Sequence, residues 1–224
     1  MSGVFVLDGF VVSDEVTEAI IENEMLLSFF LQKIKNCISE FQFHYSALEA
    51  YSKQEHVAEN RNEIWDSISE ICNSTAQVSR IFDSGSRTKG TPDQKDFTKN
   101  RGELLTVLAG LSKDDFTELK ALRELRNRVV HFDEDVDDWF LASNKSVDRT
   151  MVWRDINDST KLNHDGSTCL IQSYNCKTGI LYNLGIEYSF HELHRKMGKI
   201  AKGAHQADVK LSKLCPNRSN MTIK

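Results

Sequence analysis

The segment from Ser13 to Ser52 decides the fold class; it reads SDEVTEAIIENEMLLSFFLQKIKNCISEFQFHYSALEAYS. Its apolar residues recur at intervals close to 3.6 residues, the spacing of a helix that buries one face. They include Val16, Ile20, Leu27, Phe30, Leu31, Ile34 and Ile38. Ser13 can cap the first turn, in which Asp14 and Glu15 complement the positive end of the helix dipole. The sequence therefore predicts one long helix that runs from Ser13 to about Ser52.

A second segment, from Val57 to Phe82, has the same periodicity. Its predicted buried stripe consists of Ile64, Ile68, Ile71, Cys72, Val78 and Ile81. Two long helices joined by a short link are expected to pack antiparallel. The chain has only 2 prolines, Pro92 and Pro216, so few residues interrupt helix formation. We therefore expect a mainly α protein built on an antiparallel helical bundle.

The middle of the chain combines a predicted loop with further helices. Asp83–Asn100 contains two glycines and Pro92 among polar residues, which predicts a long mobile loop. Its basic residues could touch phosphates, although a solvated loop explains them at least as well; they are Arg87, Lys89, Lys95 and Lys99. A short helix is predicted at Leu104–Leu111. Ser112 and Asp115 form a capping pattern for a helix from about Lys113 to His131, followed by a short helical piece through Phe140.

Both ends of the chain carry strand signals. Val4–Val12 is rich in β-forming residues around Asp8-Gly9, which predicts a short strand or an extended arm. After Asn144 the predicted elements are a strand at Met151–Ile156, a hairpin of Cys169–Tyr174 and Ile180–Leu184, and a last helix from Ser189 or Phe190 to about Leu211. The predicted domains are residues 1–144, a helical bundle with an N-terminal arm, and residues 145–224, a small α+β appendage with a basic tail.

The composition limits the class of protein. Apolar residues make up 40% and charged residues 27% of the chain, an ordinary balance for a globular protein. No apolar run approaches the roughly 20 residues that span a bilayer, and the first ten residues do not form a signal peptide, so we expect no membrane contact and a cytoplasmic location. The 5 cysteines are widely spaced, which favours reduced thiols. The net charge of −5 restricts any RNA contact to a local cleft or an assembly interface.

One helix contains an unexpected polar residue. On a helical wheel of Leu119–His131, Arg126 falls among the apolar residues Leu119, Leu122, Leu125, Val129 and Val130. A buried guanidinium must find acceptors, because an unpaired buried charge costs several kcal/mol. Asn127 and His131 are four residues apart and share the opposite, polar face. A structural ion pair of Arg126 and a solvated His131 are the simplest interpretations of each residue taken alone.

Taken together, Arg126, Asn127 and His131 resemble the signature of the HEPN family: arginine, a polar residue that is often asparagine, a few further residues and histidine. The same pattern would arise by chance in about one chain in a hundred of this length. Leu125 before the motif and His131-Phe132-Asp133-Glu134 at its end are also similar to this family. The resemblance covers about Ser13–Ser143 and leaves the strand-rich part after Asn144 unexplained.

The resemblance implies an HEPN-like helical bundle that forms a homodimer and cuts RNA without a metal or another cofactor. It implies that the ribose 2′-hydroxyl attacks the adjacent phosphorus. His131 would then be the general acid or base, Arg126 would stabilise the phosphate, and Asn127 would orient the histidine or the phosphate. Members of the family often act in phage defence or as toxins restrained by an antitoxin, so a regulatory protein is a further expected partner.

The motif raises a geometric difficulty. On a regular helix Arg126 and His131 point about 140° apart, so one helix does not aim both at one atom. A symmetric dimer can combine the arginine of one subunit with the histidine of the other. We therefore predict an inactive monomer. Three acids are candidate supporting residues: Glu124 on the face of His131, Asp66 on the second helix, which could reach a buried Arg126, and Asp133 just after the motif.

Two alternatives stay open at this stage. The chain could be a non-catalytic HEPN-like module that binds a nucleotide, RNA or a partner protein, or a helical scaffold in which Arg126 forms a structural ion pair. His191 and His194 lie three residues apart, a spacing that can bind a metal, but a polar helix face explains them better and His205 would complete such a set only by chance. The sequence contains no glycine-rich phosphate loop and no paired cysteine ligands.

Overall fold

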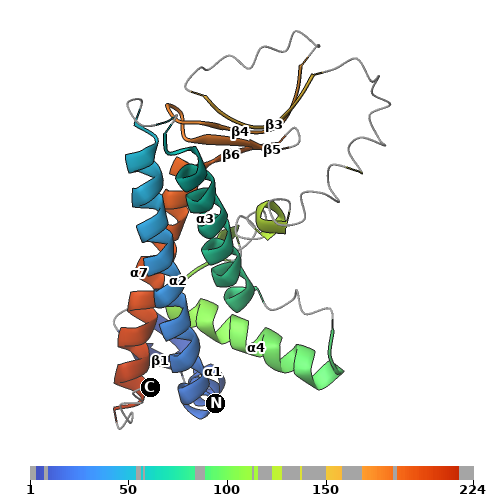
Figure 1. The fold of residues 1–224 in the computed structure, drawn as a ribbon. Coiled ribbons are helices and arrows are strands. Elements are labelled where there is room, and N and C mark those ends of the chain that lie inside the picture. Colours follow the sequence, from blue (N-terminus) through green and yellow to red (C-terminus); the bar gives the residue numbers. More distant parts are fainter. Residues whose placement is uncertain are drawn as a thin grey trace. The chain divides into compact units, whose positions relative to one another are not determined.

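The structure is a computed structural model, and it is mainly helical (Figure 1). It describes residues 4–7, 10–53, 57, 59–83, 89–112, 114–115, 123–127, 137, 150–157, 168–183 and 186–216. Its helices are α1 (Asp14–Glu22), α2 (Glu24–Tyr51), α3 (Arg61–Phe82), α4 (Pro92–Ala109) and α7 (Phe190–Leu214). Its strands are β1 (Val4–Leu7), β2 (Phe10–Ser13), β3 (Thr150–Asn157), β4 (Thr168–Asn175), β5 (Ile180–Asn183) and β6 (Ile186–Ser189).

The chain divides into two compact units, and α2, α3 and α7 each contribute to both. Unit 1 contains residues 1–39, 77–120 and 198–224, and unit 2 contains residues 40–76 and 121–197. The boundary that the sequence predicts near Asn144 lies outside the described residues. Within each unit the segment of α3 runs in the opposite direction to the segment of α2 (Figure 1), and in unit 1 Cys37 Sγ of α2 lies 3.7 Å from Gln77 Oε1 of α3. The predicted antiparallel arrangement of these two helices is therefore confirmed.

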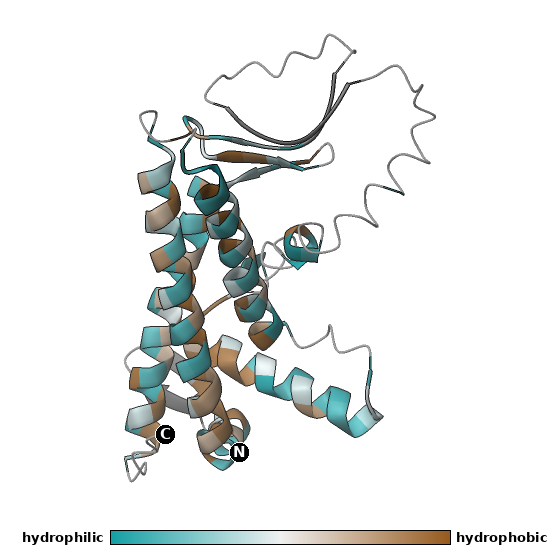
Figure 2. Cartoon of the chain, viewed as in Figure 1, coloured by the Kyte–Doolittle hydropathy of each residue, from teal (hydrophilic) through white to brown (hydrophobic). Residues whose placement is uncertain are grey.

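Burial of one face of each long helix forms the core. On α2 the fully buried side chains include Leu27, Leu31 and Ile34 in unit 1 and Phe41 and Leu48 in unit 2. Polar and apolar residues alternate along α2, α3 and α7 in Figure 2, as expected for helices that bury a single face. The predicted stripe of the second helix is also buried. The periodicity of the sequence thus identified the core of these helices.

The first predicted helix is interrupted near its start. Ser13 caps α1, because its side chain accepts a hydrogen bond from the N–H of Val16. The helix ends at Asn23, whose backbone departs from helical geometry (φ −102°, ψ 14°), and α2 begins at Glu24. The prediction of one uninterrupted helix from Ser13 to Ser52 was therefore wrong at this residue, although the cap and the far end were placed well. In the N-terminal segment that the sequence predicts to be a strand or an arm, β1 and β2 pair antiparallel.

The predicted loop at Asp83–Asn100 was wrong in its second half. Helix α4 begins at Pro92, so the helix predicted at Leu104–Leu111 is only the end of a longer one. Thr91 and Gln94 form a capping box in which each side chain accepts a hydrogen bond from the backbone N–H of the other residue. Pro92 occupies the first turn, where a missing N–H costs nothing. The helix stops at Gly110, which is in the left-handed conformation (φ 62°).

Polar contacts tie α7 to its neighbours within unit 1. Lys35 Nζ of α2 forms an ion pair with Asp208 Oδ2 of α7 at 2.7 Å. Lys210 Nζ of α7 donates a hydrogen bond to the carbonyl oxygen of Leu108 in α4 at 2.9 Å. Gly203 permits a close approach, because a Cβ added there would lie 2.9 Å from the carbonyl oxygen of Ala109. The absence of a side chain at Gly203 thus lets α7 pack directly against the end of α4.

Unit 2 contains the four-stranded sheet, in the order β3-β4-β5-β6. Strands β4, β5 and β6 are antiparallel, and β3 pairs with β4 in parallel. The hairpin predicted around Asn175–Gly179 is confirmed, as are the strand at Met151–Ile156 and the last helix, α7. Asn175 Oδ1 accepts hydrogen bonds from the N–H groups of Lys177 and Thr178. This Asx arrangement fixes the turn that ends at Gly179.

Gly179 provides a test of this turn. It is in the left-handed conformation (φ 64°), and a Cβ added there would lie 2.8 Å from Nε2 of His191. We predict that Gly179→Ala lowers the free energy of unfolding by about 1–2 kcal/mol, as measured by urea unfolding.

Gly198 is the matched control, because it lies inside α7 and an added Cβ would meet no atom within 4 Å. We predict that Gly198→Ala raises the free energy of unfolding by about 0.5–1 kcal/mol. Equal effects of the two substitutions would contradict this description of the turn.

Candidate functional site

A short helical stretch, residues 123–127 of unit 2, carries the first two residues of the motif. Leu125 is 1% exposed and Arg123 is 9% exposed, so these two side chains anchor the stretch. Arg126 is only half-buried and Asn127 is exposed. The prediction that Arg126 is the buried arginine was therefore wrong; Arg123, three residues earlier, takes that position. A helical wheel gives the direction of each residue but not which edge of the apolar sector the neighbouring elements cover.

The side chains of Arg126 and Asn127 lie together. Arg126 Nη1 donates a hydrogen bond to Asn127 Oδ1 at 3.3 Å. A guanidinium has five N–H donors and a side-chain amide has two, and within the described residues the hydrogen bond between the two side chains uses one of them. Their accessibility allows an anion such as a phosphate to approach both groups. The pair is therefore a candidate phosphate-binding element.

The remaining motif residues are placed as follows. His131 and Asp133 lie outside the described residues. Glu124 and Asp66 are both exposed. The expectation that Asp66 reaches a buried Arg126 is wrong in its premise, because Arg126 is half-buried. The structure thus brings Arg126 and Asn127 together and leaves their relation to His131 a prediction.

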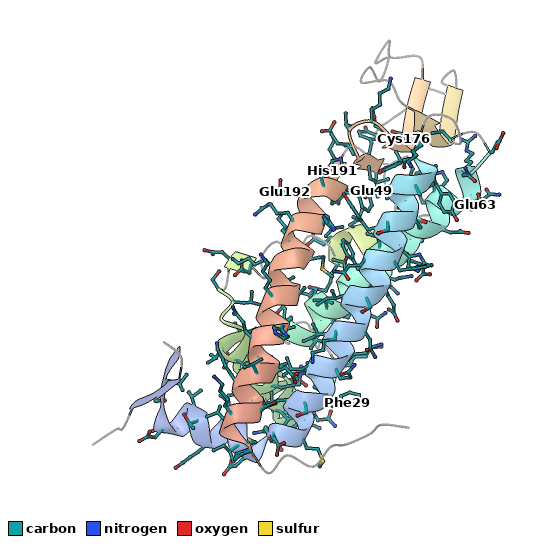
Figure 3. All side chains as sticks on the ribbon, turned by 90° about the vertical axis from the view of Figure 1, so that its left-hand side faces the viewer. Phe29, Glu49, Glu63, Cys176, His191 and Glu192 are labelled. Carbon is teal, nitrogen blue, oxygen red and sulfur yellow. The ribbon has the colours of Figure 1, made fainter. Side chains whose placement is uncertain are left out.

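A second polar cluster in unit 2 joins the C-terminal part of α2 to the first turn of α7. Tyr45 Oη lies 2.9 Å from Nδ1 of His191 (Figure 3 labels His191, at the start of α7, and Glu49 of α2). Tyr45 also hydrogen-bonds Glu49, one turn later on α2. The ring of His194 stacks on Tyr45, with centroids 4.2 Å apart and planes 11° apart. Two histidines of α7 therefore bind one tyrosine of α2, one through a hydrogen bond and one through its ring.

This cluster changes the acidity of Tyr45. Burial, together with the negative charge of Glu49 and the hydrogen bond to it, raises the pKa of Tyr45 to about 12. A phenol carries one proton and can donate it to only one partner. When Tyr45 donates that proton to Glu49, its hydrogen bond with His191 requires that Nδ1 of His191 carries a proton and donates it to the phenol oxygen. At neutral pH Tyr45 is therefore a neutral hydrogen-bonding residue that holds the two helices together, and it does not serve as a base.

The sequence did not predict this cluster. His191 and His194 were interpreted as a polar helix face or as a metal pair, and both are exposed. Within the described residues no group of three or more His, Cys, Asp or Glu side chains is arranged to hold a metal ion. Tyr45 and His191 are 146 residues apart, so no local pattern connects them. Only the packing of α7 on α2 reveals that the two histidines act as structural partners of Tyr45.

In the part of the chain that the structure describes, no helix is both long enough and apolar enough to cross a bilayer. Comparisons of the chain with protein families, with curated proteins and with solved structures find no match. The HEPN resemblance therefore rests on Arg126, Asn127 and His131 and on the helical character of the chain.

The raised pKa of Tyr45 leads to a prediction on stability at high pH. Because the folded-state pKa lies above the usual value of about 10, the contribution of neutral Tyr45 is present below pH 10 and is lost as the pH rises towards 12. We predict that the free energy of unfolding falls across this window and that it falls less steeply in Tyr45→Phe. Urea unfolding at a series of pH values measures both slopes.

Part of the slope will remain in the variant, because burial also raises the pKa of Cys72 to about 12 and the pKa of Tyr174. Identical slopes in Tyr45→Phe and the wild type would show that Tyr45 is not held as a neutral phenol by its surroundings.

Proposed function

We propose that this chain is a metal-independent endoribonuclease of the HEPN type, with Arg126, Asn127 and His131 as its catalytic residues. The observation that carries the proposal is the accessible Arg126–Asn127 pair, joined by a hydrogen bond of 3.3 Å, within the sequence pattern that resembles the family. Burial of Arg123 and Leu125 supports it further, because these residues fix the helical turn from which the pair projects. A catalytic group needs such a fixed support.

The proposed reaction is an internal transfer at phosphorus. A histidine nitrogen removes the proton of the ribose 2′-hydroxyl, and the resulting oxygen forms a bond to the adjacent phosphorus. The bond from phosphorus to the 5′-oxygen breaks, and that oxygen leaves with a proton from a general acid. An unperturbed histidine, with a pKa near 6.5, can take either role at neutral pH. Arg126 stabilises the additional negative charge on the phosphate oxygens as the new bond forms.

The pair of Arg126 and Asn127 suits the phosphate in this reaction. The guanidinium can donate two parallel hydrogen bonds to phosphate oxygens, while the amide of Asn127 keeps the guanidinium oriented through the observed hydrogen bond. Because Arg126 and His131 point about 140° apart on a regular helix, the proposal requires a homodimer that combines the arginine of one subunit with the histidine of its partner. The net charge of −5 agrees with a small local contact to RNA.

The proposal predicts cleavage of single-stranded RNA in the presence of EDTA. Arg126→Ala and His131→Ala should each lower the cleavage rate by about 100-fold or more, because each removes a group that acts in the transition state. Cleavage of end-labelled RNA, followed on a denaturing gel, measures the rates.

Arg80→Ala and His205→Ala are the matched controls, since both residues are exposed on other helices, and both variants should cleave at the wild-type rate. Cleavage that requires a divalent metal, or that persists in His131→Ala, would contradict the proposal. RNA binding without cleavage by the wild type would favour the alternative of a non-catalytic binding module.

A further inference from the structure

The solvent side of α2 carries large apolar side chains. Phe43 is 70% exposed, Met25 is 65% exposed and Phe29 is 46% exposed. In Figure 3 Phe29 lies on the side of α2 that faces away from α7. Single exposed apolar residues are common, but an aligned set on one helix is typical of an interaction surface. α2 is one uninterrupted helix of 28 residues, so the alignment follows from helix geometry alone.

These residues form a stripe with a seven-residue repeat. Phe29, Asn36 and Phe43 are seven residues apart, and at about 100° per residue they lie within about 20° of one line along the helix. Lys33 and Glu40 lie beside this line, both on the same side of it, and both are exposed. Together with Met25 these residues define what we call the outer face of α2. The opposite side of the helix includes Leu31 and Phe41, which are fully buried.

The outer face is complementary to itself when two helices run in opposite directions. With a two-fold axis at Asn36, Phe29 of one copy lies opposite Phe43 of the other, because each is seven residues, or about 10.5 Å, from the axis. Measured along the helix axis, Lys33 then lies within about 1.5 Å of Glu40 in the other copy. The symmetry repeats both contacts, which gives two phenylalanine pairs and two ion pairs.

The charges of the outer face are available for this pairing. Neither Lys33 nor Glu40 forms an ion pair with another residue in the described part of the chain. In a parallel pairing, with the two-fold axis along the helices, Lys33 and Glu40 of the two copies would lie on opposite flanks of the interface, so Lys33 would not meet Glu40 of the other copy. The pattern of charge therefore selects the antiparallel arrangement, and it selects a second copy of this chain over an unrelated apolar partner.

We propose that the outer face of α2 is a homodimer interface in which two copies of α2 pair antiparallel around Asn36. The evidence for this interface is independent of the Arg126 motif, although the interface deepens the proposed function by naming the surface that would supply the second subunit. One helix face is smaller than the surface of about 800 Å² per partner in a standard interface, so the dimer should dissociate on dilution.

Charge reversal gives the test. Lys33→Glu places like charges opposite each other at both ion pairs, and so does Glu40→Lys. We expect each single variant to raise the dimer dissociation constant by about tenfold or more, and the double variant Lys33→Glu/Glu40→Lys to restore the wild-type value. Sedimentation velocity over a dilution series measures the constants, and circular dichroism checks that the helices are retained.

Lys202→Glu is the matched control, because Lys202 is exposed on α7 and the substitution changes the net charge equally. It should leave the dissociation constant unchanged. A wild-type protein that stays monomeric at high micromolar concentration would overturn the inference, as would a double variant that remains as weak as the single ones.

A cysteine at the symmetry axis gives a second measurement. In the proposed dimer Asn36→Cys lies opposite its own copy, so mild oxidation should join two chains, as seen on a non-reducing gel. Lys202→Cys and the wild type should remain uncrosslinked. Crosslinking of Lys202→Cys to the same extent as Asn36→Cys would contradict the proposed register.

These outcomes are distinguishable from the failure of the proposed function, because none of them uses RNA. Loss of the dimer on charge reversal in a protein that cuts no RNA would support the interface and reject the nuclease. The opposite outcome is also possible: the protein cleaves RNA without a metal and through His131, but its charge variants dissociate no more readily than the wild type. That result would reject the interface and retain the nuclease.

Discussion

The burial of one face of α2 is the constraint on which the rest of the structure depends. That face is apolar along the length of the helix, and polar contacts fix α7 against it within each unit. In unit 1 the contact is the ion pair of Lys35 and Asp208 at 2.7 Å, and in unit 2 it is the hydrogen bond of Tyr45 to His191 at 2.9 Å. Because α2 buries one side completely, its other side must face solvent or another molecule. The exposed Phe29 and Phe43 on that side are the consequence.

The proposed chemistry depends on a similar division between buried and accessible residues. Arg123 and Leu125 are buried and hold a helical stretch in place, while the neighbouring Arg126 and Asn127 project their polar groups where an anion can reach them. A guanidinium that was fully buried in an ion pair would serve the fold and not a substrate. The half-burial of Arg126, with its hydrogen bond to Asn127, is therefore what distinguishes a candidate catalytic arginine from a structural one.

Patterns within one element were predictable from the sequence, and contacts between distant elements were not. The cap at Ser13 and the turn that ends at Gly179 were both identified, because each depends on neighbouring residues. Helix α4 was missed at its start, since Pro92 was taken as a loop residue although Thr91 and Gln94 carried the capping signal. Three other features depend on tertiary packing. Arg123 and not Arg126 is the buried arginine, β3 pairs with β4 in parallel, and Tyr45 clusters with His191.

The chemical form of the cut RNA ends tests the central claim most directly. Attack by the 2′-hydroxyl leaves a 2′,3′-cyclic phosphate on one fragment and a 5′-hydroxyl on the other, whatever the sequence of the substrate. We predict these ends in a reaction that contains EDTA, and we predict no cut at a nucleotide whose 2′-hydroxyl has been replaced by hydrogen. Products with a 3′-hydroxyl and a 5′-phosphate, which arise when water attacks, would contradict the assignment of Arg126, Asn127 and His131 to this reaction.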